Sequence, residues 1–159
     1  MQTFVPTSGA YHNAKILDNK RLNKQALEAW QILMVLTKLD PMGNYREPKG
    51  WVNHPAVKMW RGHELALAAY AMAMVDEWKR RGFNSTLADK IWDTVSAATR
   101  QGTINSNSIA EPEWMTNEAV HSSHRKALLV KDYEWYSQWE FPEDPGHPID
   151  SYEYVWPSN

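Results

Sequence analysis

Apolar residues recur at helical spacing along most of the chain, and this pattern predicts an all-α protein. The clearest segment is His63 to Arg81, which is rich in Ala, Leu and Met and is followed by Gly82, a residue typical of helix C-termini. A longer helix is predicted from about Asn13 to Thr37, and the turn residues that begin at Asp40 end it. These two segments are expected to supply most of the core.

Shorter helices are predicted in the rest of the chain, whereas residues 100–113 form a loop. The last eighteen residues hold four Pro and one Gly and are expected to form an irregular aromatic C-terminal strap. We therefore predict a compact single domain over residues 1–159 with about five helices. The shorter predicted helices are one with Pro55 in its first turn, one from Ser85 or Thr86 to about Ala98, one from Thr116 or Asn117 to about Lys131, and one from Tyr133 to Trp139.

Composition limits the kinds of site that the protein can form and the compartment in which we expect it. The 159 residues include no cysteine, so neither a disulfide nor a thiolate metal site can form. No apolar run reaches the ~20 residues of a membrane span, and the N-terminus lacks the layout of a secretory signal. We expect a cytoplasmic protein without membrane contact. The large side chain of Gln2 is expected to block methionine removal, so Met1 should carry the free α-amine.

The net charge of −2 hides a strong asymmetry. Residues 1–62 carry nine Lys and Arg against four Asp and Glu, whereas residues 133–159 carry none against six. One interpretation is that these are ordinary solvated faces. The other is that the basic N-terminal part attracts a phosphate backbone while the acidic tail prevents indiscriminate coating of nucleic acid.

Candidate chemistry is concentrated in residues 17–25 (LDNKRLNKQ). Asp18, Arg21 and Gln25 stand at i, i+3 and i+7, so a helix would show them on one face. They form either an ordinary surface ion pair or a site in which Arg21 and Lys24 hold phosphate while Asp18 stabilises a developing positive charge. Glu28 lies nearly on the same face and is a reserve carboxylate.

A second cluster is the run from His121 to Arg125, which places His121, His124 and Arg125 on one face of a predicted helix. Two histidines at this spacing could bind a metal, but no acidic third ligand lies close in sequence. Hydrogen bonds to phosphate and sugar fit the residue types better. A polar helix face without function is the remaining interpretation.

Aromatic residues are unusually frequent, with nine Trp and seven Tyr. Trp135 and Tyr136 offer flat surfaces on which bases could stack, although any single ring could simply close the core. Asn53 and His54 precede Pro55 at a predicted helix start, where free backbone N–H groups can bind anions.

Four groups of residues carry a resemblance to a known family. They are Leu17-Asp18-x-Lys20-Arg21-Leu22-x-Lys24-Gln25, Asn53-His54-Pro55 with Met59-Trp60-Arg61-Gly62, His121-x-Ser123-His124-Arg125 with Lys131-Asp132, and Tyr154-Val155-Trp156-Pro157. Together they resemble the pyrimidine-dimer DNA glycosylases, of which the phage endonuclease V type is a small helical glycosylase and abasic-site lyase. The likeness covers nearly the whole chain.

The resemblance implies a DNA substrate, an α-amine that attacks the sugar, a carboxylate on the first helix that supports the charged intermediate, and no metal or organic cofactor. The catalytic candidates are then Met1, Asp18 and Arg21. The candidates for contacting DNA are Lys24, Gln25, Asn53, His54, Arg61, His121, His124, Arg125, Trp135 and Tyr136.

The chain departs from the endonuclease V type in two places. That enzyme uses a threonine amine exposed by methionine removal, and its helix-one glutamate aligns with Arg21 here. Lys24 is therefore an alternative Schiff-base amine. The leading hypothesis is a DNA glycosylase that removes a damaged or modified pyrimidine, with or without lyase activity. The alternatives are an enzyme that acts on a modified base or nucleotide without strand cleavage, and a non-catalytic binder of distorted DNA.

Overall fold

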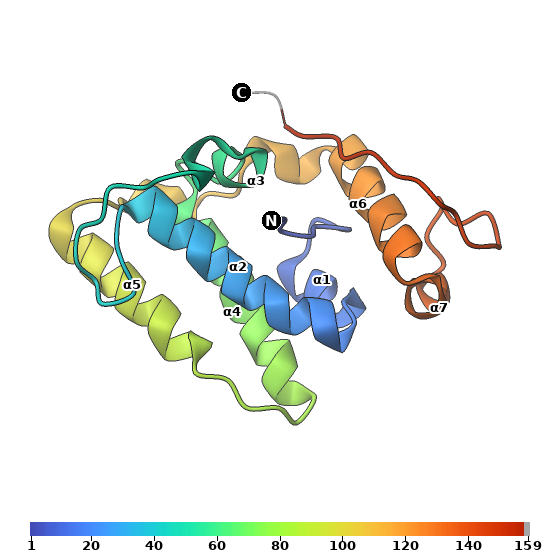
Figure 1. The fold of residues 1–159 in the computed structure, drawn as a ribbon, viewed down its shortest axis with the longest axis horizontal. Coiled ribbons are helices and arrows are strands. Elements are labelled where there is room, and N and C mark those ends of the chain that lie inside the picture. Colours follow the sequence, from blue (N-terminus) through green and yellow to red (C-terminus); the bar gives the residue numbers. More distant parts are fainter. Residues whose placement is uncertain (158–159) are drawn as a thin grey trace.

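The protein, for which a computed structural model describes residues 1–157, is built around two crossed helices (Figure 1). α2 (Asn19–Thr37) packs against α4 (Glu64–Arg80), and α5 (Leu87–Gln101) packs against both. α1 (Ala10–Ile16) also contacts α4. On the other side of the N-terminal segment, α6 (Glu118–Lys131) closes the molecule (Figure 1).

Short elements connect and finish this framework. They are η1 (Trp51–Asn53), α3 (Pro55–Lys58), η2 (Ser106–Ile109), η3 (Glu113–Thr116), α7 (Tyr133–Tyr136) and η4 (Ser137–Trp139). Residues 1–157 contain no β-strand, and an isolated bridge joins Leu39 to Tyr45. The prediction of a mostly helical, compact fold is confirmed. The predicted number of about five helices is too low, since this part of the chain forms seven α-helices and four short 3-10 helices.

The predicted first helix, Asn13 to Thr37, is divided in the structure. Leu17 adopts an extended conformation (φ −68°, ψ 137°), and Asp18 occupies the N-cap position of α2. The backbone N–H of Asp18 donates to the hydroxyl of Tyr136 at 3.1 Å. Asp18 therefore precedes the helix on which the periodicity placed it.

The other long helices agree closely with the sequence pattern. α4 differs from the predicted span by one residue at each end, and Gly82 follows it with φ +96°. α5 continues three residues beyond Ala98 and ends at Gly102, whose φ of +72° favours glycine. Asn117 caps α6, because its side chain accepts the N–H of Ala119. The cap residues thus set the helix limits.

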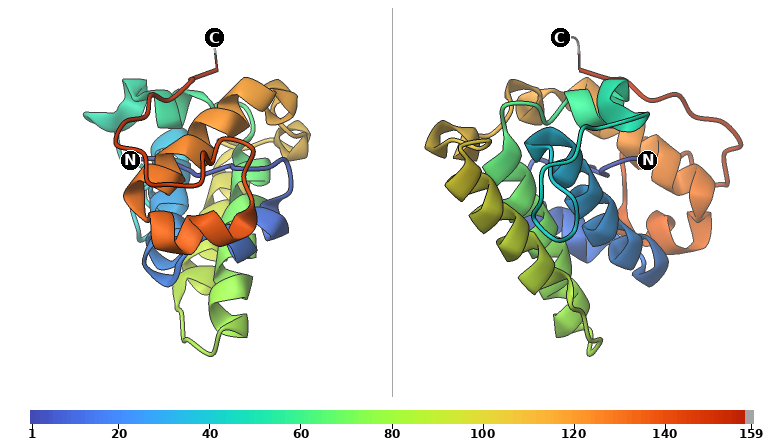
Figure 2. Two further views of the ribbon diagram at one scale, coloured as in Figure 1. Left: turned by 90° about the vertical axis from the view of Figure 1, so that its right-hand side faces the viewer. Right: turned by 60° about the vertical axis from the view of Figure 1, so that its left-hand side comes forward.

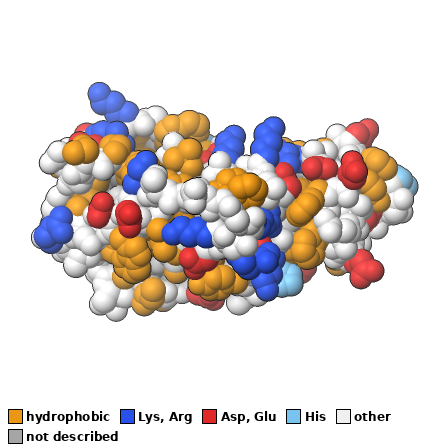
Figure 3. Space-filling view, turned by 90° about the horizontal axis from the view of Figure 1, so that it is seen from below, with side chains coloured by type: hydrophobic (Ala, Val, Ile, Leu, Met, Phe, Trp, Pro, Cys, Tyr) orange, Lys and Arg blue, Asp and Glu red, His pale blue; other side chains and the backbone are white. Residues whose placement is uncertain are grey.

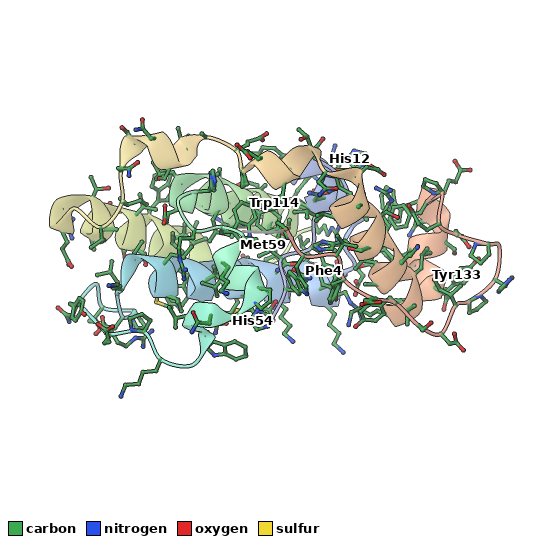
Figure 4. The ribbon with its side chains drawn as sticks, turned by 90° about the horizontal axis from the view of Figure 1, so that it is seen from above. Phe4, His12, His54, Met59, Trp114 and Tyr133 are labelled. Atoms are coloured by element: carbon green, nitrogen blue, oxygen red, sulfur yellow. The ribbon has the colours of Figure 1, made fainter. Side chains whose placement is uncertain are left out.

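Large aromatic side chains in the core are tied to the backbone by their polar atoms. The indole of Trp114 donates to the carbonyl of Met59 at 2.7 Å, and both residues lie in the middle of the molecule (Figure 4). The chain beyond η4 crosses α6 without regular structure (Figure 2), as expected for the C-terminal strap. Its Val155 N–H donates to Ser123 Oγ at 3.1 Å. No helix within residues 1–157 is both long and apolar enough to cross a membrane.

We expect Tyr136→Phe to destabilise the protein by about 1–3 kcal/mol, because the fully buried Tyr136 hydroxyl donates to the carboxylate of Asp18. Urea unfolding would measure the loss. Tyr133→Phe is the matched control, since the Tyr133 hydroxyl bonds Asp144 at a half-buried position and its removal should have a smaller effect. Equal stability of the two variants would contradict a structural role for the pair of Asp18 and Tyr136.

Candidate active site

The N-terminal segment, residues 1–7, passes through the interior between α2 and α6 (Figures 1 and 4). The side-chain amide of Gln25 holds it at two points. Its Nε2 donates to the carbonyl of Gln2 at 2.6 Å, and its Oε1 accepts the N–H of Phe4 at 2.8 Å. Gln25 thus supplies the donor and the acceptor that a neighbouring β-strand would supply, and it fixes the position of the chain start.

Side chains from the other side of the core satisfy further polar groups of this segment. The indole of Trp60 donates to Thr3 Oγ1 at 2.8 Å, and the hydroxyl of Tyr70 donates to the carbonyl of Phe4 at 2.7 Å. Burial, followed by the charge of Glu28, raises the pKa of Tyr70, so the phenol remains a donor. The segment is therefore anchored from both sides.

The predicted phosphate-binding histidines of α6 also hold the N-terminal segment. His124 Nδ1 accepts the N–H of Val5 at 2.9 Å, and both ring nitrogens of His121 face carbonyl oxygens, those of Val5 at 2.6 Å and Met115 at 2.8 Å. Burial, followed by the charge of His121, lowers the pKa of His124 to about 3. Both rings are buried, and the ring nitrogens named here face backbone groups of the protein.

Arg125 is occupied by protein partners in the same way. Its guanidinium donates to the carbonyl of Pro6 at 2.8 Å, to both oxygens of Glu143 at 2.7 and 2.8 Å, and to Glu118. Burial alone would raise the pKa of Glu143, but the hydrogen bonds that it accepts from Arg125 and Ser122 outweigh burial, so the pKa is lowered. The expectation that His121, His124 and Arg125 contact phosphate is thus replaced by a positioning role for all three.

A basic hollow of about 380 Å³ opens where the N-terminal segment meets α2. Four of its lining residues are cations and only one is a carboxylate, that of Glu28. This excess of positive charge attracts an anion, and the Glu28 carboxylate would lie next to the bound anion. The residues that line the basic hollow are Met1, Gln2, Phe4, Lys20, Arg21, Lys24, Gln25, Glu28, Lys131, Tyr152 and Tyr154.

Glu28 is the acidic side chain nearest to the chain start in this hollow. Its Oε2 accepts the N–H of Gln2 at 3.4 Å, and its Oε1 lies 3.7 Å from Lys24 Nζ. The Glu28 side chain is 16% exposed and that of Lys24 69%, so the carboxylate lies deep and the ammonium faces solvent. Met1 lines the same hollow.

Asp18 lies outside the lining of the basic hollow. It is 9% exposed, receives the Tyr136 hydroxyl, and pairs with Arg21 at 3.2 Å. Tyr136 is fully buried and Trp135 half-buried, with its indole donating to the carbonyl of Ile16 at 2.7 Å. Tyr136 is thus enclosed in the core, Trp135 keeps part of its surface open to solvent, and Arg21 lies between Asp18 and the hollow.

Five aromatic rings form a continuous row beside the chain start. The ring centroids lie 5.5 Å apart for Trp51 and His54, 6.0 Å for His54 and Trp156, 5.4 Å for Trp156 and Tyr154, and 5.1 Å for Tyr154 and Tyr152. Partial burial and the positive charge of the terminal amine lower the pKa of His54, which is labelled beside α3 in Figure 4. The row thus passes close to the amine.

The remaining predicted contacts lie around α3. His54 Nδ1 accepts the N–H of Ala56 at 3.0 Å and so caps this short helix. Asn53 and Arg61 are exposed, and Arg61 donates to the carbonyl of Val52 at 2.9 Å. Neither residue lines the basic hollow, so both can reach DNA only beyond its edge.

Sequence reasoning gave no role to Gln2, Lys20, Lys131, Tyr152 or Tyr154, although all five line the hollow. Lys20, Lys131 and Tyr154 belong to the family-like motifs, which was an available signal. The Lys131 ammonium lies 5.3 Å from the Tyr152 ring centroid, and its hydrogen bond lowers the pKa of that phenol.

Among the described residues, no group of three or more His, Asp or Glu side chains is placed to hold a metal ion.

Comparisons with known proteins agree with the sequence resemblance. A family model described as pyrimidine dimer DNA glycosylase matches residues 1–91, which is more than half of the chain and includes the N-terminal segment, α2 and α4. Searches of curated proteins and of solved structures found no match.

We expect Gln25→Leu to release the N-terminal segment, because the carbonyl of Gln2 and the N–H of Phe4 would lose their buried partner. Each unsatisfied group costs about 1–3 kcal/mol. Hydrogen exchange at the Phe4 amide should accelerate at least tenfold, since about 1.4 kcal/mol corresponds to that factor. Gln31→Leu, at an exposed position of the same helix, should leave this exchange unchanged. Unchanged exchange in Gln25→Leu would contradict the proposed clamp.

The low pKa of His124 also predicts a pH dependence of stability. An unfolded histidine titrates near 6.5, so between pH 6.5 and about 3 the unfolded state binds more protons and stability falls with falling pH. The slope is at most about 1.4 kcal/mol per pH unit.

We expect the free energy of unfolding, measured with urea between pH 7 and 5, to depend less on pH in His124→Gln than in the wild type. His54, whose pKa is also lowered, should leave a residual slope. The exposed His147→Gln should behave like the wild type. Equal slopes in all three proteins would show that His124 does not remain neutral in the fold.

Proposed function

The chain belongs to the pyrimidine dimer DNA glycosylase family, and on this premise we propose that it removes a damaged pyrimidine from DNA by attack of the Met1 amine on the sugar. The observation that carries the proposal is the shared hollow of Met1 and Glu28, enclosed by four cations. Met1, one carboxylate and four cationic side chains thereby line one space, which suits a nucleophile, a charge-stabilising group and a contact to phosphate.

An α-amine suits this task better than a lysine. Amines of chain ends titrate near pH 8 and lysine side chains near 10.4, so a larger share of an α-amine has its lone pair free at neutral pH. The anchoring of residues 2–7 supports the proposal, because it limits where Met1 can lie. Lys24 is the alternative amine and points into solvent.

The proposed reaction proceeds through a covalent intermediate. The Met1 nitrogen forms a bond to sugar C1′, the bond from C1′ to the base breaks, and its electron pair leaves with the base, which takes up a proton. The attached amine loses a proton, its lone pair forms the C1′=N bond as the C1′–O4′ bond breaks, and O4′ takes up a proton, which gives a ring-opened iminium ion. Loss of a C2′ proton to a carboxylate would then break the C3′–O bond with its electron pair on phosphate, which is the lyase step.

We assign the supporting carboxylate to Glu28 in place of Asp18. A negative group stabilises the positive charge that builds on the sugar as the base departs. Glu28 lines the hollow and lies next to Gln2, whereas the carboxylate of Asp18 is occupied by Tyr136 and Arg21. Glu28 can also accept the C2′ proton of the lyase step.

The cations of the basic hollow supply the contact to the DNA backbone. Lys20, Arg21, Lys24 and Lys131 surround the space in which the sugar would lie. Gln2 adds a further donor, since its buried Nε2 has no hydrogen-bond partner among the described residues. On the face seen in Figure 3, Lys and Arg lie over the left and middle among some acidic side chains, whereas the right-hand end, where the chain after α7 lies, shows acidic side chains and no Lys or Arg. The local charge, and not the net charge of −2, would therefore govern binding.

Borohydride trapping tests the proposal. With duplex DNA that carries a pyrimidine dimer or an abasic site, the wild type should form a covalent adduct, and peptide mapping should place it on Met1. Base release without any adduct would overturn the amine route and favour attack by water. An adduct on Lys24 would move the nucleophile to that residue.

Glu28→Gln should reduce cleavage of the glycosidic bond by about 10²–10⁴-fold with little change in DNA affinity, because it removes the charge and keeps the shape. The matched control is Glu134→Gln, at an exposed position on α7. Excision assays and equilibrium binding on the same dimer-containing duplex would measure both effects. Full turnover of Glu28→Gln would exclude this carboxylate from the chemistry, and a loss of binding without a change in turnover would support a role in recognition alone.

A further inference from the structure

The proposed reaction needs a proton donor when the sugar ring opens. As the C1′–O4′ bond breaks, its electron pair moves to O4′, and this oxygen has to gain a proton. Glu28 must stay negative to support the positive charge, and the nitrogen of Met1 has already lost its proton when its lone pair forms the C1′=N bond. The donor is therefore expected among the other side chains that line the basic hollow.

Two phenols line the basic hollow on the side of the C-terminal strap. Tyr152 and Tyr154 belong to this strap, whereas Glu28 belongs to α2, on the other side of the chain start (Figure 1). The ring centroids of the two tyrosines lie 5.1 Å apart. Tyr152 is 38% exposed and Tyr154 is half-buried, so Tyr152 is the more accessible of the two.

The surroundings of Tyr152 favour the loss of its proton. Lys131, in the last turn of α6, holds its ammonium 5.3 Å from the Tyr152 ring centroid. The hydrogen bond from Lys131 lowers the pKa of Tyr152, and burial opposes this change. A hydrogen bond from Tyr154 and the positive charge of Arg21 add to the lowering of the pKa. A phenolate at this position would thus be stabilised from α6, from the strap and from α2.

Tyr154 keeps its own proton and orients that of Tyr152. Burial, followed by the charge of Tyr152, raises the pKa of Tyr154. Tyr154 is therefore the donor in the hydrogen bond between the two phenols, and the Tyr152 oxygen is the acceptor. Because the Tyr152 oxygen accepts from both Tyr154 and Lys131, its hydroxyl hydrogen is left available for a bound molecule.

We propose that Tyr152 is the catalytic acid that protonates O4′ as the sugar ring opens. The inference rests on the proposed function, since it takes the reacting sugar to lie at the Met1 amine in the basic hollow. The electron pair of the breaking C1′–O4′ bond forms the new O4′–H bond, and the pair of the Tyr152 O–H bond remains on the phenolate. Solvent, which took up the proton of the attached amine, returns a proton to the phenolate.

A phenol suits this hollow better as an acid than the four cations do. A lysine or arginine that gave up a proton would lose the charge with which it holds the DNA backbone. A phenol is neutral before the transfer and negative after it, so the cations that bind phosphate also stabilise the phenolate. The excess of positive charge in the basic hollow thus favours ionisation of Tyr152.

Separate assays of bond cleavage and ring opening test the inference. Both use a duplex that carries a pyrimidine dimer, in single turnover. Photoreversal of the dimer after the reaction frees the detached base and so measures cleavage of the glycosidic bond, whereas borohydride trapping measures the ring-opened iminium ion. We expect Tyr152→Phe to keep bond cleavage within twofold of the wild type and to slow trapping by about 10²–10⁴-fold, the range typical of general acid catalysis.

The pH dependence of trapping distinguishes an acid from a hydroxyl that only supports the fold. Because the acid must be protonated, trapping by the wild type should fall as the pH rises through the pKa of Tyr152, which lies below the value of about 10 for a free tyrosine. Replacement of Tyr152 by a fluorinated tyrosine, which is more acidic, should move this fall to lower pH.

Two further variants sharpen the test. Tyr154→Phe removes a hydrogen bond to the phenolate, so it should move the fall in trapping to higher pH. Tyr11→Phe makes the same chemical change at an exposed position that does not line the basic hollow. It should match the wild type in both assays and in the pH profile.

Trapping by Tyr152→Phe at the rate of the wild type would overturn the assignment of Tyr152. An equal loss of bond cleavage and trapping would also overturn it, because the residue would then act before the ring opens. A pH profile that the fluorinated tyrosine does not shift would have the same meaning. Failure of the wild type to cleave the glycosidic bond would instead overturn the proposed function, and the inference with it.

Discussion

The fold depends on how the buried N-terminal segment is supplied with hydrogen-bond partners. An extended segment inside a helical protein has no neighbouring strand, and each unsatisfied backbone group costs about 1–3 kcal/mol. Here side chains take the place of that strand. Gln25 supplies a donor and an acceptor from α2, Tyr70 a donor from α4, and His124 an acceptor from α6. Three helices are thereby linked through the chain start, and the position of Met1 follows from their packing.

This arrangement explains why so many polar residues of α6 are buried. His124 remains neutral because a neutral ring can accept the N–H of Val5, and burial lowers its pKa accordingly. Arg125 retains its charge because Glu143 and Glu118 compensate it within hydrogen-bond distance. Since Glu143 belongs to the acidic C-terminal part, the negative charge of that part serves at least partly to neutralise a buried cation. One of the six acidic residues of this part is thus balanced inside the molecule.

The sequence predicted the long helices better than it predicted the site. Apolar periodicity, Gly82 after α4 and the cap at Asn117 define α4 and α6 within one or two residues, and α5 ends three residues later than predicted. Periodicity could not reveal the break at Leu17, because the hydroxyl of Tyr136, which receives the Asp18 N–H, is 118 residues away along the chain. The same limit applies to the roles of residues. His121, His124 and Arg125 have the composition of a phosphate site, and only the tertiary structure shows that their partners are Val5 and Pro6. Arg21, Lys24 and Gln25 do gather at one hollow, as their helical spacing indicated.

Sequence spacing alone does not decide which carboxylate would support the proposed reaction. The partners of each carboxylate in the structure distinguish the two candidates. Asp18 and Glu28 both lie near Arg21 in sequence, and either could balance a cation. Asp18 has the partners of a structural group: a buried hydroxyl, and an arginine 3.2 Å away. Glu28 shares the hollow with Met1, and its contacts are a long hydrogen bond of 3.4 Å and a lysine at 3.7 Å that faces solvent. A carboxylate held so loosely can shift its interaction to a developing positive charge at little cost, whereas Asp18 would first have to leave its buried partner. The weak contacts of Glu28 therefore support its assignment as the carboxylate that stabilises the developing positive charge.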